Sequence, residues 1–157
     1  GCFSVGINQI IIPLVDDGRI DNNEQSKALL DFLHEKETTI SDRGIQIVFE
    51  SDLAPDELKG FIGQFNAKTF GINYDIGNSA ALGFDVESEF EAYGDRILNV
   101  HVKDRILKGT TVPLGNGNAD FTKVFNQLAI IGYSGNYILQ TQEERAHVLA
   151  QAILTLQ

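Results

Sequence analysis

The stretch ILNVHVKDR, residues 97–105, decides how the fold is interpreted. Apolar and polar side chains alternate along it: the apolar set is Leu98, Val100 and Val102, and the polar set is Asn99, His101 and Lys103. Successive side chains of a β-strand point to opposite faces of the sheet. The stretch therefore predicts a strand over residues 97–103, with one apolar face and one polar face that carries an imidazole, and the charged residues Asp104 and Arg105 follow it at once.

Four further segments are predicted strands; they are residues 8–15, 44–51, 70–75 and 136–141. Segments with apolar residues three and four positions apart, the pattern of a helix, follow the strands at residues 22–36, 54–65, 85–94, 120–132 and 143–156. Asn22 or Asn23 and Asp85 suit helix N-caps, and Pro55 suits a first helical turn. Strands that alternate with helices predict a parallel sheet built from βα units.

Two architectures fit this alternation. Five units in 157 residues are about 31 residues each, and eight such units would need about 250, the usual size of a (β/α)₈ barrel. A doubly wound sheet of five strands would fit the chain as it stands, but strands covered by helices on both faces usually read as continuous apolar runs. The polar inner faces favour the barrel. We therefore predict α/β class, an apparently incomplete (β/α)₈ TIM barrel with about five βα units, residues 1–157 being a single domain.

The composition is that of a globular protein. The chain carries 12 Lys and Arg against 22 Asp and Glu, a formal net charge of −10, and an acidic surface repels phosphate backbones. No apolar run approaches the roughly 18 residues of a membrane span, and a first residue other than Met suggests a missing N-terminal portion. The single cysteine, Cys2, excludes an intramolecular disulfide.

Cysteine usage of this kind fits a reducing compartment, so we expect a cytoplasmic protein. From the acidic charge and the lack of a long apolar run we expect neither nucleic-acid nor membrane partners.

The polar residue nearest the carboxyl end of each of four strands forms a set that could bind a metal ion: Glu50, Asp75, His101 and Gln140. Barrel strands end at one rim, so these side chains are predicted to converge. Buried ions are costly unless they are compensated, and a divalent cation compensates carboxylates. Carboxylate and imidazole suit Mn²⁺, Zn²⁺, Co²⁺ or Fe²⁺, and carboxylates also suit Mg²⁺; the amide of Gln140 is a weaker ligand. Taken singly, His101 could be a core histidine and the acids could be helix caps.

The charged residues that end the central strand lie on the same predicted rim. Lys103 or Arg105 could hold a phosphate, carboxylate or hydroxyl group of a substrate, and the planar fork of Arg105 suits anions. The alternative is a cluster of surface ion pairs, and for Asp104 this is our expectation.

The loop LGNGNADF, residues 114–121, is expected at this rim as well. Its backbone N–H groups could receive an anion. It could equally be a tight turn before a helix capped by Asn118 or Asp120.

Four short motifs, taken in order, resemble a known family; they are VFES (48–51), YDIGN (74–78), HVKDR (101–105) and VPLGNGNADF (112–121). Together they resemble the xylose isomerase-like TIM-barrel superfamily, which comprises sugar phosphate isomerases and epimerases and an AP endonuclease-like group. The resemblance covers nearly the whole chain and corresponds to strands four to eight, so it implies the C-terminal part of a barrel. It implies Glu50, Asp75 and His101 as metal ligands. The sequence departs from the family at Gln140, where a ligand Glu is usual, and at Asn78, where many epimerases carry a substrate-binding His.

The resemblance implies a metal-dependent sugar or sugar-phosphate isomerase or epimerase that moves a proton next to a carbonyl. Glu50 would be the base, and Asn78, Lys103 and Arg105 would contact the substrate. Gln140 cannot serve as a second base, because an amide does not take up a proton near neutral pH. A one-base proton shuttle, an isomerisation or a dehydration therefore remains open beside epimerisation.

Two other functions remain as alternatives. One is a truncated or degenerate barrel without catalysis, whose open sheet edges would pair with another chain and could give a homo-oligomer. The other is a metal-dependent phosphodiester hydrolase of the AP endonuclease type. The acidic composition and the single well-placed histidine, His101, disfavour the hydrolase.

Overall fold

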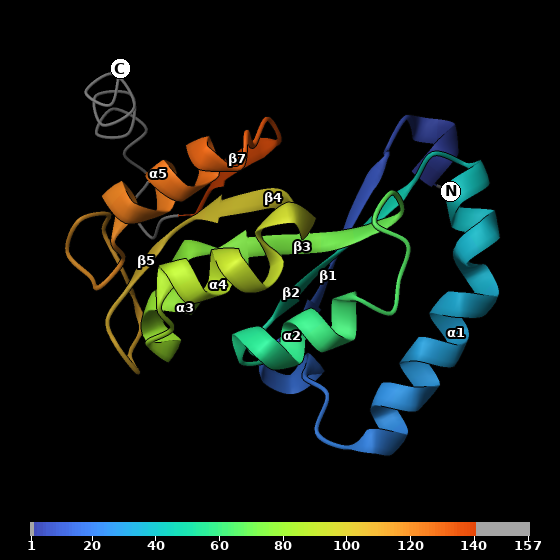
Figure 1. The fold of residues 1–157 in the computed structure, drawn as a ribbon, viewed down its shortest axis with the longest axis horizontal. Helices are drawn as coiled ribbons and strands as arrows, with labels where there is room; N and C mark the ends of the chain where they lie inside the picture. The colour runs from blue at the N-terminus through green and yellow to red at the C-terminus, as the bar shows by residue number, and fades with distance from the viewer. Residues whose placement is uncertain (1, 141–157) are drawn as a thin grey trace.

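The computed structural model describes residues 2–140 and contains one five-stranded parallel sheet (Figure 1). Its strands are β1 (Gln9–Leu14), β2 (Gln46–Ser51), β3 (Phe70–Asp75), β4 (Ile97–Val102) and β7 (Asn136–Leu139). Each predicted strand is confirmed to within two residues; the last residue of the segment predicted at 136–141 lies outside the described part.

The order of the strands decides between the two predicted architectures. Neighbours in the sheet follow chain order, β1-β2-β3-β4-β7, and every pair is parallel. A doubly wound sheet reverses its strand order at a switch point, and this sheet does not. Because parallel crossovers are right-handed, a sequential order puts the helices on one face and leaves the other face for the inside of a barrel. The α/β barrel prediction is confirmed, with five strands of the parallel barrel sheet in the described residues.

Four predicted helices are present: α1 (Asn23–Asp42), α2 (Pro55–Ile62), α4 (Val86–Tyr93) and α5 (Phe121–Ile130). The side chains of Asn22, Asp85 and Asp120 cap α1, α4 and α5 by accepting backbone N–H groups. The fifth predicted helix, residues 143–156, lies outside the described part of the chain.

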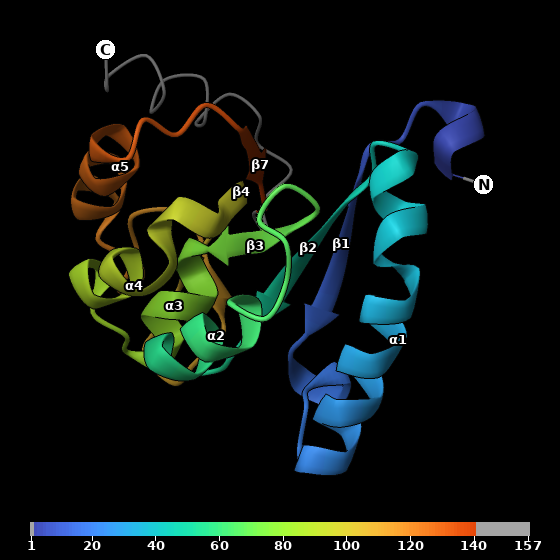
Figure 2. The ribbon, with the colours of Figure 1, turned by 45° about the vertical axis from the view of Figure 1, so that its right-hand side comes forward.

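Helix α1 runs six residues beyond its predicted end at residue 36. Ile40 lies seven positions after the buried Leu33 and packs against the core, so the apolar stripe continues for two more turns. Figure 2 shows α1 beside β1, at the opposite end of the sheet from α5 and β7. No helix within residues 2–140 is both long and apolar enough to cross a bilayer.

Several short elements were not predicted. Helix α3 (Ile76–Leu82) follows β3 without a loop, and the two-residue strands β5 (Asp104–Arg105) and β6 (Thr111–Val112) form an antiparallel pair. Three 3₁₀ turns complete the set, at Cys2–Val5, Asp16–Gly18 and Gly94–Arg96. A strand of two residues shows no alternation, and a helix of three to seven residues is shorter than the window of about 11 to 18 residues in which a helical period is recognised.

The core between sheet and helices is rich in phenylalanine. Phe49 of β2 meets Phe61 of α2 at a ring-centroid distance of 5.3 Å, and Phe65 meets Phe70 of β3 at 4.7 Å. Burial of each such ring contributes about 1.5–3 kcal/mol. Phe49 lies one residue before Glu50 and Phe70 lies five residues before Asp75. The packed rings therefore hold in place the two strands whose ends carry these acids.

Candidate active site

Glu50, Asp75 and His101 converge at the carboxyl edge of the sheet, as predicted. Asp75 and His101 are paired in the β3–β4 register, and Glu50 stands near the end of the adjoining strand β2. One ligand atom from each of the three lies within 4.8 Å of the others, and within residues 2–140 this is the one such group of His, Cys, Asp and Glu side chains. His101 Nδ1 lies 3.2 Å from Glu50 Oε2 and 3.7 Å from Asp75 Oδ2. Two carboxylates and an imidazole at this spacing can bind one divalent cation.

The two oxygens of the buried Asp75 carboxylate have different surroundings. Oδ1 accepts the backbone N–H of Asn78 at 2.8 Å and so caps α3. Oδ2 lies 2.8 Å from Lys103 Nζ but makes no well-directed hydrogen bond within the described part of the chain. Burial raises the pKa of Asp75, but the contacts with His101, Lys103 and the N–H of Asn78 outweigh it and hold this pKa below the usual value. Asp75 is therefore a carboxylate whose Oδ2 is held by the charges of Lys103 and His101 rather than by a well-directed hydrogen bond.

His101 faces both acids through the same ring nitrogen. Burial lowers its pKa, but the carboxylates of Asp75 and Glu50 outweigh burial and raise the pKa of His101 to about 9. The protonated, positively charged form of the His101 ring is thus strongly favoured.

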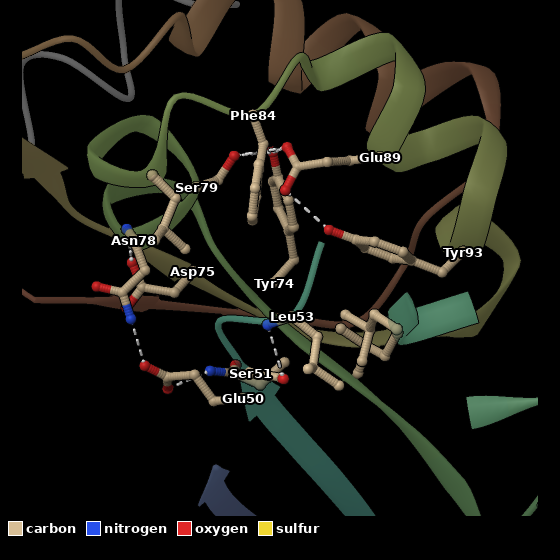
Figure 3. Close-up of a pocket in the computed structure, with 14 residues that line it drawn as sticks. Glu50, Ser51, Leu53, Tyr74, Asp75, Asn78, Ser79, Phe84, Glu89 and Tyr93 are labelled. Carbon is tan, nitrogen blue, oxygen red and sulfur yellow. Dashed lines mark hydrogen bonds between the residues drawn. The ribbon is translucent and has the colours of Figure 1, made fainter. Parts of the chain in front are cut away.

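Glu50 is held by an amide on each oxygen. Asn73 Nδ2 donates to Oε2 at 2.8 Å. Asn78 Nδ2 donates to Oε1 at 2.8 Å (Figure 3). One hydrogen bond per oxygen leaves further lone pairs on the carboxylate for a proton or a ligand.

Asn78 and Arg105, both predicted to contact substrate, lie at this site and contact each other. Arg105 Nη1 donates to Asn78 Oδ1 at 2.8 Å, while its Nε and Nη2 donate to Gly109 O. With its oxygen occupied by Arg105, Asn78 presents its NH₂ group to Glu50. Arg105 thus acts on the geometry of Glu50 through one intermediate side chain.

Lys103 brings Gln140 to the same edge. Its Nζ donates to Gln140 Oε1 at 3.4 Å while it pairs with Asp75, and the backbone N–H of Gln140 donates to Val102 O, so the β4–β7 pairing extends to this residue. All four predicted ligand positions therefore lie at one edge. Lys103 contacts both Gln140 and Asp75 and so links the amide to that acid.

The expectation for Asp104 was wrong. Asp104 is 1% exposed rather than on the surface, and its carboxylate accepts the backbone N–H groups of Gly115, Gly117 and Ala119 at 2.8–3.1 Å. A buried carboxylate is tolerated when charge-assisted hydrogen bonds replace its water. A Cβ at Gly117 would overlap this carboxylate. Since three N–H groups of the loop 114–121 already bind Asp104, and Asp120 caps α5, the loop is the tight turn rather than an anion site.

Two groups of polar residues were missed by sequence reasoning. Asn73 lies under the site, and its inward position in the alternation of 70–75 was the available signal. Glu89 of α4 is 1% exposed and accepts hydroxyl hydrogens from Tyr74 (2.8 Å), Ser79 (2.5 Å) and Tyr93 (2.8 Å). Its signal was an acid on the apolar stripe of residues 85–94. Figure 3 shows this second acid group and Glu50 lining one cavity, of about 20 Å³.

The chain is similar in sequence to sugar epimerases. It is 32% identical over 133 residues to the L-ribulose-5-phosphate 3-epimerase UlaE of Escherichia coli O1:K1 / APEC, a match that covers 80% of this chain and 46% of that protein. The chain thus spans about half the length of the curated relatives it matches.

Solved structures share the fold. The xylose isomerase domain protein from Planctomyces limnophilus superposes with a TM-score of 0.76 at 22% identity, covering 98% of this chain and 61% of that one. The IOLI protein, crystallised with a zinc atom, superposes with a TM-score of 0.74 at 23% identity, covering 98% of this chain and 62% of that one.

Strand order, the polar rim and these likenesses agree, and they confirm the resemblance drawn from the four short motifs. A family model described as xylose isomerase-like TIM barrel matches residues 3–156, and the chain belongs to this family.

Proposed function

We propose that this chain is the C-terminal part of a metal-dependent sugar or sugar-phosphate isomerase or epimerase, with the described strands as strands four to eight of its barrel. The single observation that carries the proposal is the convergence of Glu50, Asp75 and His101 within 4.8 Å at the carboxyl edge of the sheet. The similarity to an L-ribulose-5-phosphate 3-epimerase supports a ketose phosphate as the class of substrate.

The residues at this edge fit a divalent cation. Asp75 Oδ2 is a buried carboxylate oxygen without a well-directed hydrogen bond in the described residues, and Glu50 and His101 offer an oxygen and a nitrogen beside it. Gln140 adds at most an amide oxygen. When bound, such a cation would polarise the carbonyl and neighbouring hydroxyl of a sugar and so acidify the C–H bond between them. A zinc atom in the structurally similar IOLI protein supports this assignment.

Glu50 is proposed as the base. Its carboxylate takes the proton from the carbon next to the carbonyl, and the C–H electrons become the double bond of an enediolate. Asn73 and Asn78 hold the two oxygens in place, which removes rotational freedom before the transfer.

The return of the proton is proposed to use the same face. Gln140 stands where the family carries an acid, and its amide cannot deliver a proton. Lys103 and Arg105 supply two positive charges near the acids, and we propose that they hold the hydroxyl or phosphate groups of the substrate together with Asn78. Glu50 then returns the proton to the same carbon or to its neighbour, which gives exchange or isomerisation rather than inversion.

Exchange of a substrate proton with solvent tests the role of Glu50. The full-length protein with Mn²⁺ and L-ribulose 5-phosphate in D₂O is expected to place deuterium next to the carbonyl, as seen by NMR. Glu50→Gln should slow this exchange by about 10²–10⁴-fold, the usual contribution of a general base. Glu57→Gln is the matched control, because Glu57 is exposed on α2 and, among the residues that the structure describes, its side chain bonds the N–H of Ala54 alone. Exchange in Glu50→Gln equal to that in the control would remove Glu50 as the base.

A barrel without catalysis is the second candidate, favoured by Gln140 and its contact with Lys103. It predicts neither Mn²⁺ binding nor deuterium exchange. The phosphodiester hydrolase has less support, because residues 2–140 contain only one group of converging metal-binding side chains.

We propose that residues 1–157 form one domain with the preceding part of the barrel. The single cysteine fits a reducing compartment, and we propose the cytoplasm as the place of action. Association into homo-oligomers stays a prediction that mass measurement in solution would check.

A further inference from the structure

Asn73 and Asn99 form a pair of buried amides directly beneath the candidate site. They are 2% and 0% exposed and face each other in the β3–β4 register. Asn99 Nδ2 donates to Asn73 Oδ1 at 2.6 Å. Asn73 Nδ2 in turn lies 2.8 Å from Glu50 Oε2 and 3.0 Å from His101 Nδ1.

The donation from Asn99 determines which end of Asn73 faces the site. An amide carries an acceptor oxygen on one side and a donor NH₂ group on the other. With its oxygen bound to Asn99, Asn73 must present NH₂ to Glu50. Against Glu50 and Asn99, the reversed amide would place its oxygen against the carboxylate and its NH₂ against the NH₂ of Asn99, two repulsive contacts in place of two attractive ones. The third neighbour, His101 Nδ1 at 3.0 Å, accepts from the NH₂ of Asn73 when that nitrogen carries no proton.

The surroundings of Asn99 indicate that its amide is not there for stability. Its Oδ1 is buried and has no hydrogen-bond partner among the residues that the structure describes, and an unsatisfied buried oxygen costs stability. A side chain of the same shape without polar atoms would avoid that cost. Within residues 2–140, the one hydrogen bond that the Asn99 side chain makes is the one that orients Asn73.

We propose that Asn99 and Asn73 are positioning residues that act in series on Glu50. Asn99 fixes the amide of Asn73, and Asn73 fixes Oε2 of Glu50 beside His101, while Asn78 and Arg105 perform the matching task on Oε1. The inference rests on the proposed function, since it concerns how Glu50 is held for cation binding and proton transfer.

Mn²⁺ affinity of the full-length protein, measured by calorimetry over a double-mutant cycle, tests the series. Asn73→Leu should weaken Mn²⁺ binding about 10–100-fold, the effect typical of residues that orient a ligand. Asn99→Leu, although it touches no ligand, should weaken binding about tenfold, and the double variant should bind like Asn73→Leu alone, because residues in one chain of bonds are coupled. Tyr93→Phe is the control: it also removes a buried hydrogen bond, to Glu89, but should leave Mn²⁺ affinity within twofold.

Two results would overturn the series: an Asn99→Leu protein with wild-type affinity, or effects of the two single variants that multiply in the double variant. Crystal structures without metal separate this inference from the proposed function. In Asn99→Leu, or in Asn99→Ala should the first variant not fold, the Asn73–Glu50 bond should be lost and the Asn78–Glu50 bond kept. If the wild type binds no Mn²⁺, the metal-dependent function fails, and an unmoved Glu50 in these structures would still reject the series.

Discussion

Two buried carboxylates, Asp75 and Glu89, lie on either side of the same small cavity and differ in how they are satisfied. Glu89 accepts three hydrogen bonds from neutral hydroxyl groups. Asp75 accepts one N–H on Oδ1 and leaves Oδ2 to the charges of Lys103 and His101. The first is a closed network that stabilises the packing of α4 on β3 and α3. The second depends on positively charged neighbours.

The pKa shifts of the two acids run in opposite directions for this reason. Burial raises the pKa of Glu89, and hydroxyl donors offset it only in part. Burial also acts on Asp75, but positively charged neighbours outweigh it and lower the pKa. Hydroxyl groups supply hydrogen bonds without net charge, whereas an ammonium supplies both. Charge of the partners, more than burial, distinguishes a structural acid from one suited to chemistry.

The largest expected effect is the loss of metal binding in Asp75→Asn. Asparagine can still cap α3, so the fold should persist, but the ligand charge is gone and Mn²⁺ affinity should fall by at least about 100-fold, beyond the range for residues that only orient a ligand. Glu89→Gln should leave affinity within twofold. Calorimetry measures the Mn²⁺ affinity of both variants. Equal losses of affinity would show that the two acids do not differ in metal binding.

A second variant sharpens the comparison by adding a charge. Gln140→Glu places a carboxylate where the family resemblance expects one, next to Lys103 and thus near Asp75. Mn²⁺ affinity should rise about tenfold, because charged oxygen binds hard cations better than an amide does. An unchanged affinity in the same calorimetric titration would show that Gln140 lies outside the reach of the cation.

The smallest expected effect is on how the stability of the fold depends on pH. The folded pKa of Glu89 lies above its ordinary value of 4.5, so its contribution to stability is complete below about pH 4.5 and is lost as pH rises through the raised pKa. The melting temperature should fall in this window by about 2–4 °C for each kcal/mol lost. Glu89→Gln should lack this fall. Asp75 has a pKa below 3.8, so it should instead contribute to stability above pH 3.8 and lose this contribution as pH falls. If the melting temperature of Glu89→Gln followed pH as that of the wild type does, the raised pKa would not belong to Glu89.

The parts of the fold and of the site that depend on side-chain alternation and on helix capping could be predicted from the sequence. The strand ends, the N-caps Asn22 and Asp85, and the convergence of Glu50, Asp75 and His101 all follow from a period of two and from parallel strands that end at one edge. The role of Asp104 could not be predicted, because its partners lie 11 to 15 residues away in a loop whose path is set by tertiary contacts. Helix α3 was missed because its seven residues are fewer than a helical period needs to be recognised, although the sequence had allowed Asp75 to be a helix cap.

The double use of Asp75 limits how it can bind an ion. Oδ1 caps the first turn of α3, so Oδ2, which lies beside His101, is the oxygen placed to meet a cation, and Asp75 would give one oxygen. Glu50 carries one amide on each oxygen and would bind through a remaining lone pair, with Oε2 beside His101. Ligands that give one oxygen each leave several coordination positions vacant, and those positions would be free for the oxygens of a small molecule that must enter and leave.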